Sequence, residues 1–342
     1  MSLRIVLAGM GARGKYWAEV IKRSPRCALV AYVDPNPKAL EEARQTFGEQ
    51  PTFSSVEEAL SQVKDVQALI LATPPEGREV QIRAACEHRV PLLVEKPLAL
   101  DVDEAAKYVR IAEDAGVSLM VGLNFRYLGV TKELVKLFES GTVGQPAFAR
   151  FTYERWRDGT LARLNKYPLT MKHPMLWEQS IHHFDLMRFV YQKEPTAVYC
   201  QTWNPPWSMY EGDTNVSAVF TFEDDLVVNY QGTWQSGWQH PHFEWRTDCT
   251  EGIVRQDDQF GALAYARRQD ATLTSVGLPP HEQWVTDTVG VLEAFVRHLK
   301  DGAPLECSGR DHLQSLRMVQ GCILSAARQE TLQFTRLEEV IM

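Results

Sequence analysis

The stretch RIVLAGMGARG, residues 4–14, decides the fold of the first part of this chain. An apolar run ends in the pattern Gly9-x-Gly11-x-x-Gly14, and the amphipathic segment 15–24 that follows predicts a helix. In such a strand–turn–helix unit Gly9 permits the tight turn and Gly11 lets a pyrophosphate approach the backbone, while Gly14 lets the helix pack closely on the strand. The amide groups at the helix N-terminus then attract the phosphates.

An acidic residue follows the glycine pattern at the distance that is typical of dinucleotide binding. Asp34 ends the next apolar run, 20 positions after Gly14, where its carboxylate can accept hydrogen bonds from ribose hydroxyls. A 2′-phosphate would meet a like charge there, so the sequence favours NAD over NADP, although Lys38 offers a phosphate partner nearby. The alternative is that the glycines form only a turn and Asp34 is only a surface acid. The order of strand, turn, helix and acid disfavours that alternative.

The sequence around this unit predicts two domains. Apolar runs alternate with amphipathic segments, at 27–34, 66–73, 91–96 and 118–124. This alternation is typical of a parallel sheet with helices on both faces. Later strand-like segments lie closer together, at 147–156, 197–203, 215–222 and 226–234, and predict an antiparallel or mixed sheet with one exposed face. Two long amphipathic helices are expected near 282–300 and 309–329. We expect domains 1–124 and 125–342, packed together.

Composition disfavours several classes of function. The chain of 342 residues has a net charge of −8, which argues against a nucleic-acid partner and against an anionic membrane surface. No apolar run approaches the roughly 20 residues that a membrane helix needs. The six cysteines lie far apart and the chain begins directly with a strand. We therefore expect reduced, mostly buried thiols and a cytoplasmic protein.

A lysine stands where open α/β sheets bind their ligands. The segment VEKPL, residues 94–98, places Glu95, Lys96 and Pro97 at the carboxyl end of a buried strand. A lysine that emerges from an apolar strand is suited to proton transfer, and Pro97 fixes the chain direction after it, with a cis peptide as one option. The alternative is a lysine that pairs with a carboxylate for structure alone, and the residues themselves leave both interpretations open.

The segment EQSIHHFDLM, residues 178–187, contains two adjacent histidines between two carboxylates. On an α-helix with about 100° per residue, Glu178, His182 and Asp185 share one face, while His183 points toward apolar neighbours. We therefore predict that His182 faces a site and that His183 is a hydrogen-bonded core or wall residue. The alternatives are a core role for His182 and a metal site that includes the HPH segment at 240–242. Metal sites usually have a closed spacing of ligands, so we predict no metal.

Taken in order, these motifs resemble the Gfo/Idh/MocA family, which includes glucose–fructose oxidoreductase, inositol dehydrogenase and the rhizopine-catabolism oxidoreductase. The likeness covers the whole chain. Its further motifs are ATPP (72–75), EKP (95–97), VGLNFRY (121–127), EQSIHHFDLMRF (178–189) and LECSGRDHLQSLRMV (305–319). The resemblance implies an α/β protein with an N-terminal Rossmann domain, a doubly wound parallel sheet, and a C-terminal α/β domain with a large open, mostly antiparallel sheet. Members typically oxidise a hydroxyl of a sugar or cyclitol with a nicotinamide cofactor, or reduce the matching carbonyl.

The resemblance also implies roles for single residues. Lys96 matches the lysine of the family's EKP motif, and Glu178, His182 and Asp185 fall on its D-x-x-x-H-x-x-D pattern. We expect Lys96, His182 and Asp185 to be catalytic, with His182 taking the proton of the alcohol and Lys96 hydrogen-bonding the same oxygen. Substrate contacts are expected from Lys96, Tyr153, Arg157, Trp177, Glu178, His182 and Asp185. Cofactor contacts, with NAD expected, are predicted for Gly9, Met10, Gly11, Ala12, Arg13, Gly14, Asp34, Thr73, Pro74, Pro75, Arg78, Glu95, Lys96 and Asn124.

Three departures from the family pattern point to a changed substrate preference. Glu178 replaces an aspartate, and the segment HPMLW, residues 173–177, replaces a glycine run and puts Trp177 near the entrance. Arg78 stands where histidine is common, either as a cation for the cofactor pyrophosphate or as a surface charge.

We interpret the sequence as an NAD-dependent dehydrogenase of a sugar, inositol or related polyol. The exposed face of the second sheet would make it a homodimer or homotetramer. One alternative is a dinucleotide-sensing regulator without turnover, which the presence of Lys96 and His182 disfavours. Another is an enzyme that keeps its cofactor and cycles between two sugars, for which the expected export or arm segment is absent.

Overall fold

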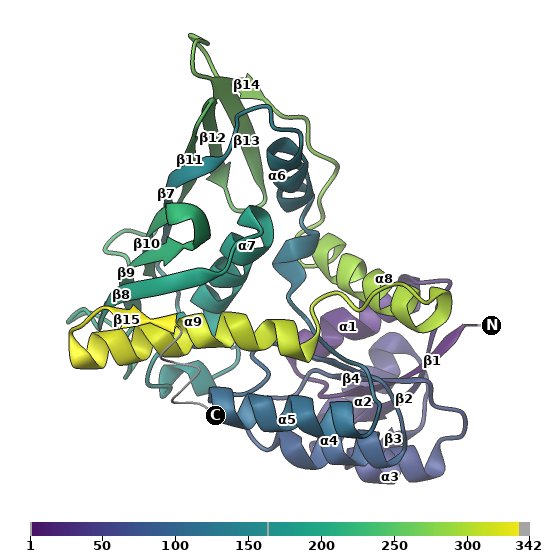
Figure 1. The fold of residues 1–342 in the computed structure, drawn as a ribbon. Coiled ribbons are helices and arrows are strands. Elements are labelled where there is room, and N and C mark those ends of the chain that lie inside the picture. The colour runs from purple at the N-terminus through teal and green to yellow at the C-terminus, as the bar shows by residue number, and fades with distance from the viewer. Residues whose placement is uncertain (1, 163, 335–342) are drawn as a thin grey trace. The chain divides into compact units, whose positions relative to one another are not determined.

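Figure 1 shows the computed structural model, which describes residues 2–162 and 164–334. The chain forms two compact units. One contains the residues up to Asn124 together with Trp284–Leu313, and the other contains Phe125–Gln283 together with the residues from Gln314 onward. The division after Asn124 is where the sequence predicts a domain boundary. Residues 284–313, which the sequence places in the second domain, are part of the first unit.

The first unit is a doubly wound parallel sheet between two layers of helices (Figure 1). Its six strands have the order β3-β2-β1-β4-β5-β6, which confirms the predicted Rossmann arrangement. The strands are β1 (Leu3–Ala8), β2 (Cys27–Val33), β3 (Thr52–Phe53), β4 (Ala68–Leu71), β5 (Leu92–Val94) and β6 (Leu119–Val121). The helices are α1 (Ala12–Arg23), α2 (Pro37–Phe47), α3 (Val56–Gln62), α4 (Arg78–Glu87), α5 (Val102–Asp114) and α8 (Thr286–Asp301), followed by the start of α9 (Gly309–Arg328).

Local sequence explains where these helices begin. Asn36, Ser55 and Asp101 each stand before a helix and accept a hydrogen bond from a backbone amide of its first turn. The strands β4 and β5 are fully buried, as expected for a sheet that is covered on both faces. Helix α8 packs beside α1, which explains why its segment belongs to the first unit.

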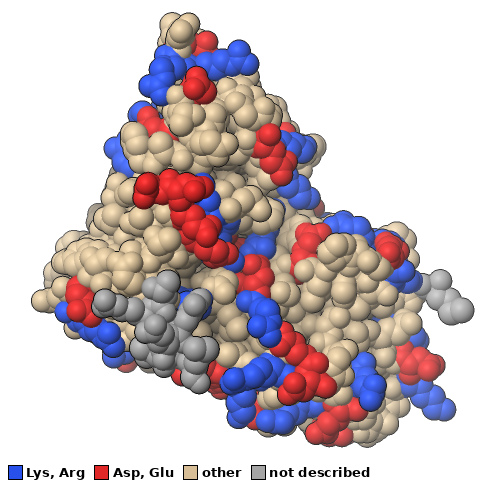
Figure 2. All heavy atoms as spheres, viewed as in Figure 1, with Lys and Arg blue, Asp and Glu red and all other residues tan. Residues whose placement is uncertain are grey.

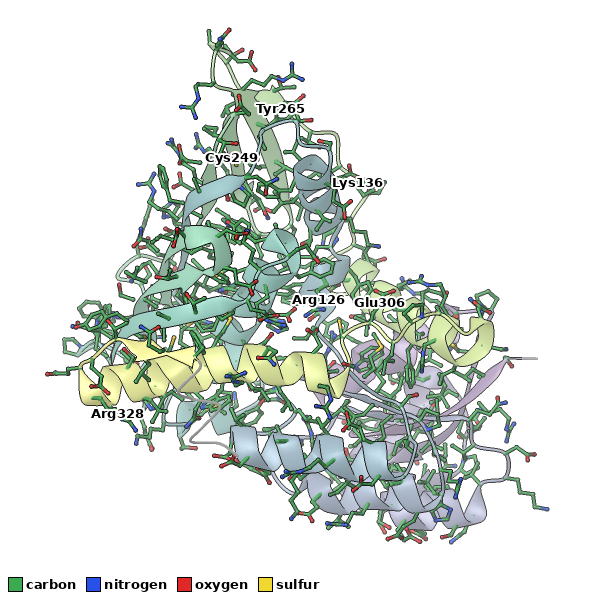
Figure 3. The ribbon with its side chains drawn as sticks, viewed as in Figure 1. Arg126, Lys136, Cys249, Tyr265, Glu306 and Arg328 are labelled. Carbon is green, nitrogen blue, oxygen red and sulfur yellow. The ribbon has the colours of Figure 1, made fainter. Side chains whose placement is uncertain are left out.

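The second unit contains a nine-stranded mixed sheet of order β14-β13-β12-β11-β7-β10-β9-β8-β15. Within the described residues, β10 and β7 are the only strands of this sheet that pair in parallel. The strands are β7 (Pro146–Glu154), β8 (Pro195–Trp203), β9 (Asn215–Phe222), β10 (Val227–Thr233), β11 (His242–Cys249), β12 (Gly252–Asp258), β13 (Gly261–Arg267), β14 (Thr274–Ser275) and β15 (Leu332–Gln333). Its helices are α6 (Gly129–Glu139), α7 (Ile181–Tyr191) and most of α9. Strands β11, β12 and β13 were not predicted from the sequence. Figure 3 labels Cys249 on β11 and Tyr265 on β13.

The large sheet has one buried and one exposed face. Along β7 the side chain of Phe151 is fully buried, whereas that of Phe148 is 55% exposed. Strand β9 of the same sheet alternates in the same way, with Phe220 buried and Val219 42% exposed. Helix α7 is buried along nearly its whole length, and the turn before it contacts β9 and β10. The predicted half-exposed sheet is confirmed.

The surface in Figure 2 carries acidic and basic side chains interspersed, with no continuous basic patch on the face shown. No helix within residues 2–162 and 164–334 is long and apolar enough to cross a membrane. The six cysteines are free thiols, and all except Cys27 are buried, as the sequence predicts.

Candidate functional site

The glycine turn after β1 has the geometry that a bound dinucleotide needs. Gly9 has φ +89°, and a Cβ atom there would lie 2.7 Å from the carbonyl oxygen of Ala72. A Cβ atom on Gly14 would lie 1.8 Å from the carbonyl oxygen of Gly9, so only glycine fits. Beside Gly11, in contrast, no atom lies within 4 Å of the Cβ position. The turn is therefore tightly packed on its inner side and open at Gly11, beside the first-turn amides of α1.

Asp34 is fixed by the backbone of the same turn. Its Oδ2 accepts a hydrogen bond from the amide of Met10 at 2.7 Å, and its Oδ1 accepts one from the amide of Asn36 at 2.8 Å. The side chain is half-buried, and each carboxylate oxygen has a second lone pair. Asp34 can therefore accept hydrogen bonds from a diol while it holds the turn in place. Together with the open space at Gly11, this geometry fits an adenine dinucleotide.

Glu95 connects the glycine turn to the segment that contains Lys96. Its Oε1 accepts hydrogen bonds from Arg13 Nε at 2.6 Å and from Trp17 Nε1 at 2.7 Å. Glu95 is only 7% exposed, so this charge-assisted contact is well shielded from water. Lys96 itself is half-buried, and the peptide bond between Lys96 and Pro97 is cis.

The turn after β4 supplies the next predicted cofactor residues. Thr73 Oγ1 donates to Gln81 Oε1 at 2.9 Å, Pro74 is exposed and Pro75 is buried. The interpretation of Arg78 as a surface charge is wrong, because its side chain is 1% exposed and its guanidinium donates to backbone carbonyls.

Asn124, at the end of the first unit's main segment, is 3% exposed. Its side-chain amide donates to the carboxylate of Asp287 on α8. Helix α8 thus anchors a predicted cofactor residue that comes from a distant part of the sequence.

In the second unit, a π-helical turn precedes the helix that carries the two histidines. Residues Met175–Ser180 form the π-helix and Ile181–Tyr191 form α7. The segment is not one continuous α-helix, as the prediction assumed: His182 and Asp185 lie in α7, whereas Glu178 lies in the π-helical turn, where the hydrogen bonds are shifted by one residue. Such turns are frequent at functional sites.

His182 is held by an aromatic ring. It is 7% exposed, and its imidazole stacks on Phe125 with ring centroids 4.3 Å apart and an angle of 19° between the planes. Stacking fixes the plane of the imidazole and leaves the hydrogen-bonding edge to polar partners.

His183 is a hydrogen-bonded core residue, as predicted. It is fully buried, and burial lowers its pKa to about 3, so the imidazole is neutral at pH 7. Its Nε2 lies 3.1 Å from the amide nitrogen of Gln179, which donates to it, and its Nδ1 lies 2.9 Å from the hydroxyl of Tyr230. That hydroxyl also bonds Ser180 at 2.9 Å, and burial raises the pKa of Tyr230 well above its ordinary value.

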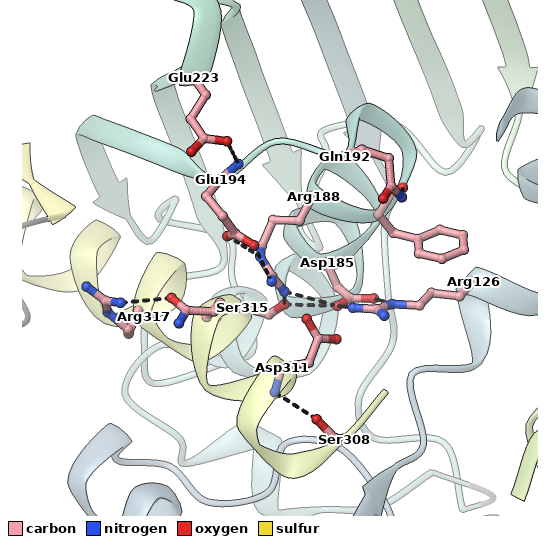
Figure 4. A network of polar contacts seen from close by, with 12 residues as sticks. Arg126, Asp185, Arg188, Gln192, Glu194, Glu223, Ser308, Asp311, Ser315 and Arg317 are labelled. Carbon is pink, nitrogen blue, oxygen red and sulfur yellow. Dashed lines mark hydrogen bonds and ion pairs between the residues drawn. The ribbon is translucent and has the colours of Figure 1, made fainter. Parts of the chain in front are cut away.

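Asp185 is the centre of a buried ionic network (Figure 4). Arg126 donates to both of its oxygens, from Nε at 2.7 Å and from Nη2 at 2.5 Å, and Ser315 Oγ donates to Oδ1 at 2.9 Å. Arg188 lies 3.8 Å from the same oxygen and forms a bidentate pair with Glu194. Asp185 is 1% exposed, so a substrate hydroxyl would compete with Arg126 for this carboxylate.

Aromatic side chains surround the remaining predicted substrate residues. Glu178 Oε1 accepts a hydrogen bond from the hydroxyl of Tyr167 at 2.8 Å, and Trp177 is 5% exposed. The hydroxyl of Tyr153 donates to Gln179 at 3.4 Å. The guanidinium of Arg157 lies 4.0 Å from the ring centroid of Trp234 and donates to the hydroxyl of Tyr210 at 3.2 Å. Arg157 and Glu178 thus each contact the hydroxyl of a tyrosine.

Three supporting residues were not assigned these roles from the sequence. Phe125 stacks on His182, Arg126 pairs with Asp185, and Tyr230 bonds His183. The sequence signal for the first two was present, since they lie within VGLNFRY, but their partners are about 57–59 positions away in the sequence. Tyr230 lies in an ordinary strand and carries no such signal.

No group of three or more histidine, cysteine, aspartate or glutamate side chains among the described residues is arranged to hold a metal ion. In the HPH segment, His242 Nδ1 lies 3.3 Å from Glu154 Oε2 instead.

Comparison with known proteins gives matches over most of the chain. The family model described as "Oxidoreductase family, NAD-binding Rossmann fold" matches residues 3–123, and the one described as "GFO/IDH/MocA C-terminal domain" matches residues 131–255. The inositol 2-dehydrogenase of Rhizobium meliloti is 26% identical over 351 residues, which cover 96% of this chain and 98% of that protein. The D-apiose dehydrogenase of Paraburkholderia graminis is 26% identical over 326 residues, or 91% of this chain and 84% of that one. An oxidoreductase from Agrobacterium radiobacter in complex with NAD+, L-tartaric acid and magnesium has the same fold, with a TM-score of 0.89 at 19% identity over 98% of this chain and 100% of that chain.

Proposed function

The chain belongs to the Gfo/Idh/MocA family of NAD-binding oxidoreductases, and from this premise we propose that it is a dehydrogenase of a sugar, inositol or related polyol that uses NAD. The observation that carries the proposal is the glycine turn, which is closed at Gly9 and Gly14, open at Gly11, and held by Asp34. Two relatives are named as dehydrogenases of D-apiose and of inositol, which supports a sugar or polyol as the substrate.

NAD is the proposed cofactor, and NADP is disfavoured. When bound, the nicotinamide supplies the acceptor for the hydride. The first-turn amides of α1 would hold the pyrophosphate, and the carboxylate of Asp34 would bind the ribose hydroxyls and repel a 2′-phosphate. Met10, Ala12, Arg13, Thr73, Pro74, Pro75, Glu95, Lys96 and Asn124 complete the proposed cofactor-binding set, whereas the guanidinium of Arg78 is buried against backbone carbonyls.

His182 is the proposed general base. Oxidation of a secondary alcohol releases a proton from the hydroxyl oxygen, and an imidazole is suited to accept it near neutral pH. The stack on Phe125 restricts the ring to one plane, which limits the reorganisation needed for proton transfer. His183 cannot take this role, because both of its ring nitrogens already have partners in the core and its pKa is lowered to about 3.

Lys96 is the proposed partner of the same oxygen. Its ammonium group would donate a hydrogen bond and stabilise the negative charge that develops as the proton leaves. The proposal requires one substrate hydroxyl to contact Lys96 and His182 together.

Asp185 and Glu178 complete the proposed site in supporting positions. Asp185 is proposed to hold α7, and so His182, in register through Arg126. Glu178 is proposed to bind a neighbouring hydroxyl, with Tyr167 directing its carboxylate. Tyr153, Arg157 and Trp177 are proposed to line the substrate pocket.

A panel of polyols, inositols and aldoses with NAD and with NADP tests the function, with reduced nicotinamide followed by absorbance. We expect turnover with NAD for at least one member and a loss of about 100-fold or more in kcat for Lys96→Ala and for His182→Ala. Lys107→Ala is the matched control for lysine, because Lys107 is an exposed residue of α5. Binding of NAD without turnover of any compound would instead support the regulator, and wild-type rates in both site variants would refute the assignment of the residues.

The exposed face of the large sheet is the proposed interface of a homodimer or homotetramer. Phe148, Val219 and Tyr199 on this face are 55%, 42% and 38% exposed, and such apolar surface favours association. Light scattering after gel filtration should give an oligomer for the wild type and a smaller species for Phe148→Glu. A monomeric wild type at micromolar concentration would refute this interface. The free, mostly buried thiols support the proposed cytoplasmic location.

A further inference from the structure

Arg78, the first residue of α4, is a buried cation whose donors are directed at backbone carbonyls. Its Nη1 donates to Glu95 O at 2.7 Å, to Pro97 O, and to Leu98 O at 3.2 Å, while its Nη2 donates to Thr73 O at 2.5 Å. The side chain is 1% exposed. One guanidinium thus joins the turn after β4 to the segment after β5.

The chemistry of this contact requires arginine. The carbonyls that follow the ends of two parallel strands have no strand partner, and a buried carbonyl without a donor is unfavourable by about 1–3 kcal/mol. A guanidinium has five N–H donors in a rigid plane, whereas a neutral imidazole has a single donor and an ammonium group has no planar fork. A histidine side chain at this position could not reproduce this set of contacts.

The residues that accept hydrogen bonds from Arg78 lie on both sides of Lys96 in the sequence. Glu95 lies before it and Pro97 and Leu98 after it, and each gives its carbonyl to the guanidinium. A backbone amide of the same segment is also bonded, because the amide of Leu98 donates to Nε2 of His312 at 3.3 Å. The backbone on both sides of Lys96 is therefore fixed by side chains from distant parts of the first unit.

We propose that Arg78 is a positioning residue for Lys96, which it sets in place through the carbonyls of residues 95, 97 and 98. The inference rests on the proposed function, since it concerns the lysine of that reaction. Misplacement of a reacting group by about 1 Å lowers a rate by about 100-fold. Loss of the contacts of Arg78 should accordingly lower kcat while leaving the binding of the dinucleotide nearly intact.

A double-mutant cycle tests whether Arg78 acts through Lys96. We expect Arg78→Lys and Arg78→Ala to lower kcat by about 10–100-fold and to change the KM for NAD by less than about threefold. In the background of Lys96→Ala, the same substitutions should have no further effect, because residues that act as a unit are not additive. Multiplied losses in the double variant, or an unchanged kcat in the single variants, would overturn the proposal. Arg83→Ala, an exposed arginine of the same helix, is the control and should retain the wild-type kcat.

Chemical rescue separates a positioning role from general damage to the fold. Free guanidinium at millimolar concentration should restore kcat of Arg78→Ala by about fivefold or more and should leave Lys96→Ala unchanged. The absence of rescue in a variant with the wild-type melting temperature would count against the proposal. If Arg78→Ala does not fold, Arg78→Lys and Arg78→His provide the kinetic test.

A readout that needs no turnover separates this inference from the proposed function. The rate at which an amine-acylating reagent modifies Lys96, relative to the exposed Lys107 in the same sample, is measured by peptide mass spectrometry. Arg78→Lys should change this ratio by about threefold or more, since Lys96 loses its fixed position. An unchanged ratio would refute the positioning role even if the wild type is an active dehydrogenase. A changed ratio in a protein without any turnover would support the role of Arg78 and reject the proposed function.

Discussion

The buried imidazole of His183 should make the stability of this protein fall as the pH is lowered below 6.5. Burial lowers the pKa of His183 to about 3, whereas the same group in an unfolded chain has a pKa of about 6.5. Between these values the unfolded chain binds more protons than the folded chain, so acid favours unfolding. The loss begins below pH 6.5 and continues to about pH 3.

The size of the effect follows from the difference between these two pKa values. At pH 7 the imidazole is mostly neutral in both states, and at pH 5 it is protonated only in the unfolded state. The difference amounts to about 2 kcal/mol between pH 7 and pH 5. His183→Asn removes the titrating group. The difference in free energy of unfolding between the wild type and this variant should therefore decrease by about 2 kcal/mol from pH 7 to pH 5. Urea unfolding followed by circular dichroism at both pH values measures it.

Tyr230→Phe is the matched control for this experiment. It removes the hydroxyl that bonds Nδ1 of His183 but keeps the imidazole, so it should destabilise the protein by about 1–3 kcal/mol at both pH values. A constant difference between wild type and His183→Asn from pH 7 to pH 5 would refute the reasoning. It would mean that His183 is protonated in the folded protein or reaches water without unfolding.

Three further predictions concern the other networks. Arg126→Met should lower the free energy of unfolding by about 3–5 kcal/mol, measured with urea, because it leaves the carboxylate of Asp185 buried without its bidentate partner. Gly14→Ala should lower the melting temperature, by an amount equivalent to about 1–3 kcal/mol or more, since its Cβ would lie 1.8 Å from the carbonyl oxygen of Gly9. Asp34→Ala should raise the KM for NAD and increase the ratio of kcat/KM for NADP to that for NAD by about 10-fold or more. The substitution removes a negative charge that repels the 2′-phosphate by about 1.4 kcal/mol, and steady-state rates with both cofactors measure the ratio.

The first two of these predictions each have a control in the same unit. Arg246→Met breaks the pair of Arg246 with Asp248, which is partly exposed, and should have an effect below about 1 kcal/mol. Gly11→Ala should keep the wild-type melting temperature, because no atom lies within 4 Å of its Cβ position, yet weaken the binding of NAD. Equal losses for Arg126→Met and Arg246→Met, or for the two glycine variants, would contradict the structural reasoning.

The first unit could be predicted in detail because its signals are local. Five of its six parallel strands are apolar runs in the sequence, whereas the two-residue strand β3 was not predicted. Helix α2 begins with Pro37, a residue that favours the first position of a helix. The strands β11 and β12 were missed because their exposed face carries charges such as Arg246, Asp248 and Arg255, which interrupt the apolar pattern without preventing a strand. The position of α8 in the first unit depends on packing between distant segments, which periodicity does not report.

The candidate site divides in the same way between local and distant causes. The glycine turn and Asp34 were predictable, since their spacing expresses one short structural unit. The π-helical turn at Met175–Ser180 was not, because a shift of hydrogen bonding by one residue leaves no pattern in composition. The burial of Arg78 was also hidden, since its acceptors are backbone carbonyls, which every residue has.

Lys96 and His182, the two proposed reactive residues, belong to different units, yet an arginine holds the chain around each of them. The backbone around Lys96 is held by the guanidinium of Arg78, and the helix that carries His182 is held by the ion pair of Arg126 with Asp185. In both cases a guanidinium group holds main chain or helix rather than ligand. Buried charges of this kind seldom add net stability compared with apolar residues. Their value lies in fixing one arrangement of the chain, so their substitution should lower the rate of hydride transfer more than the affinity for either ligand.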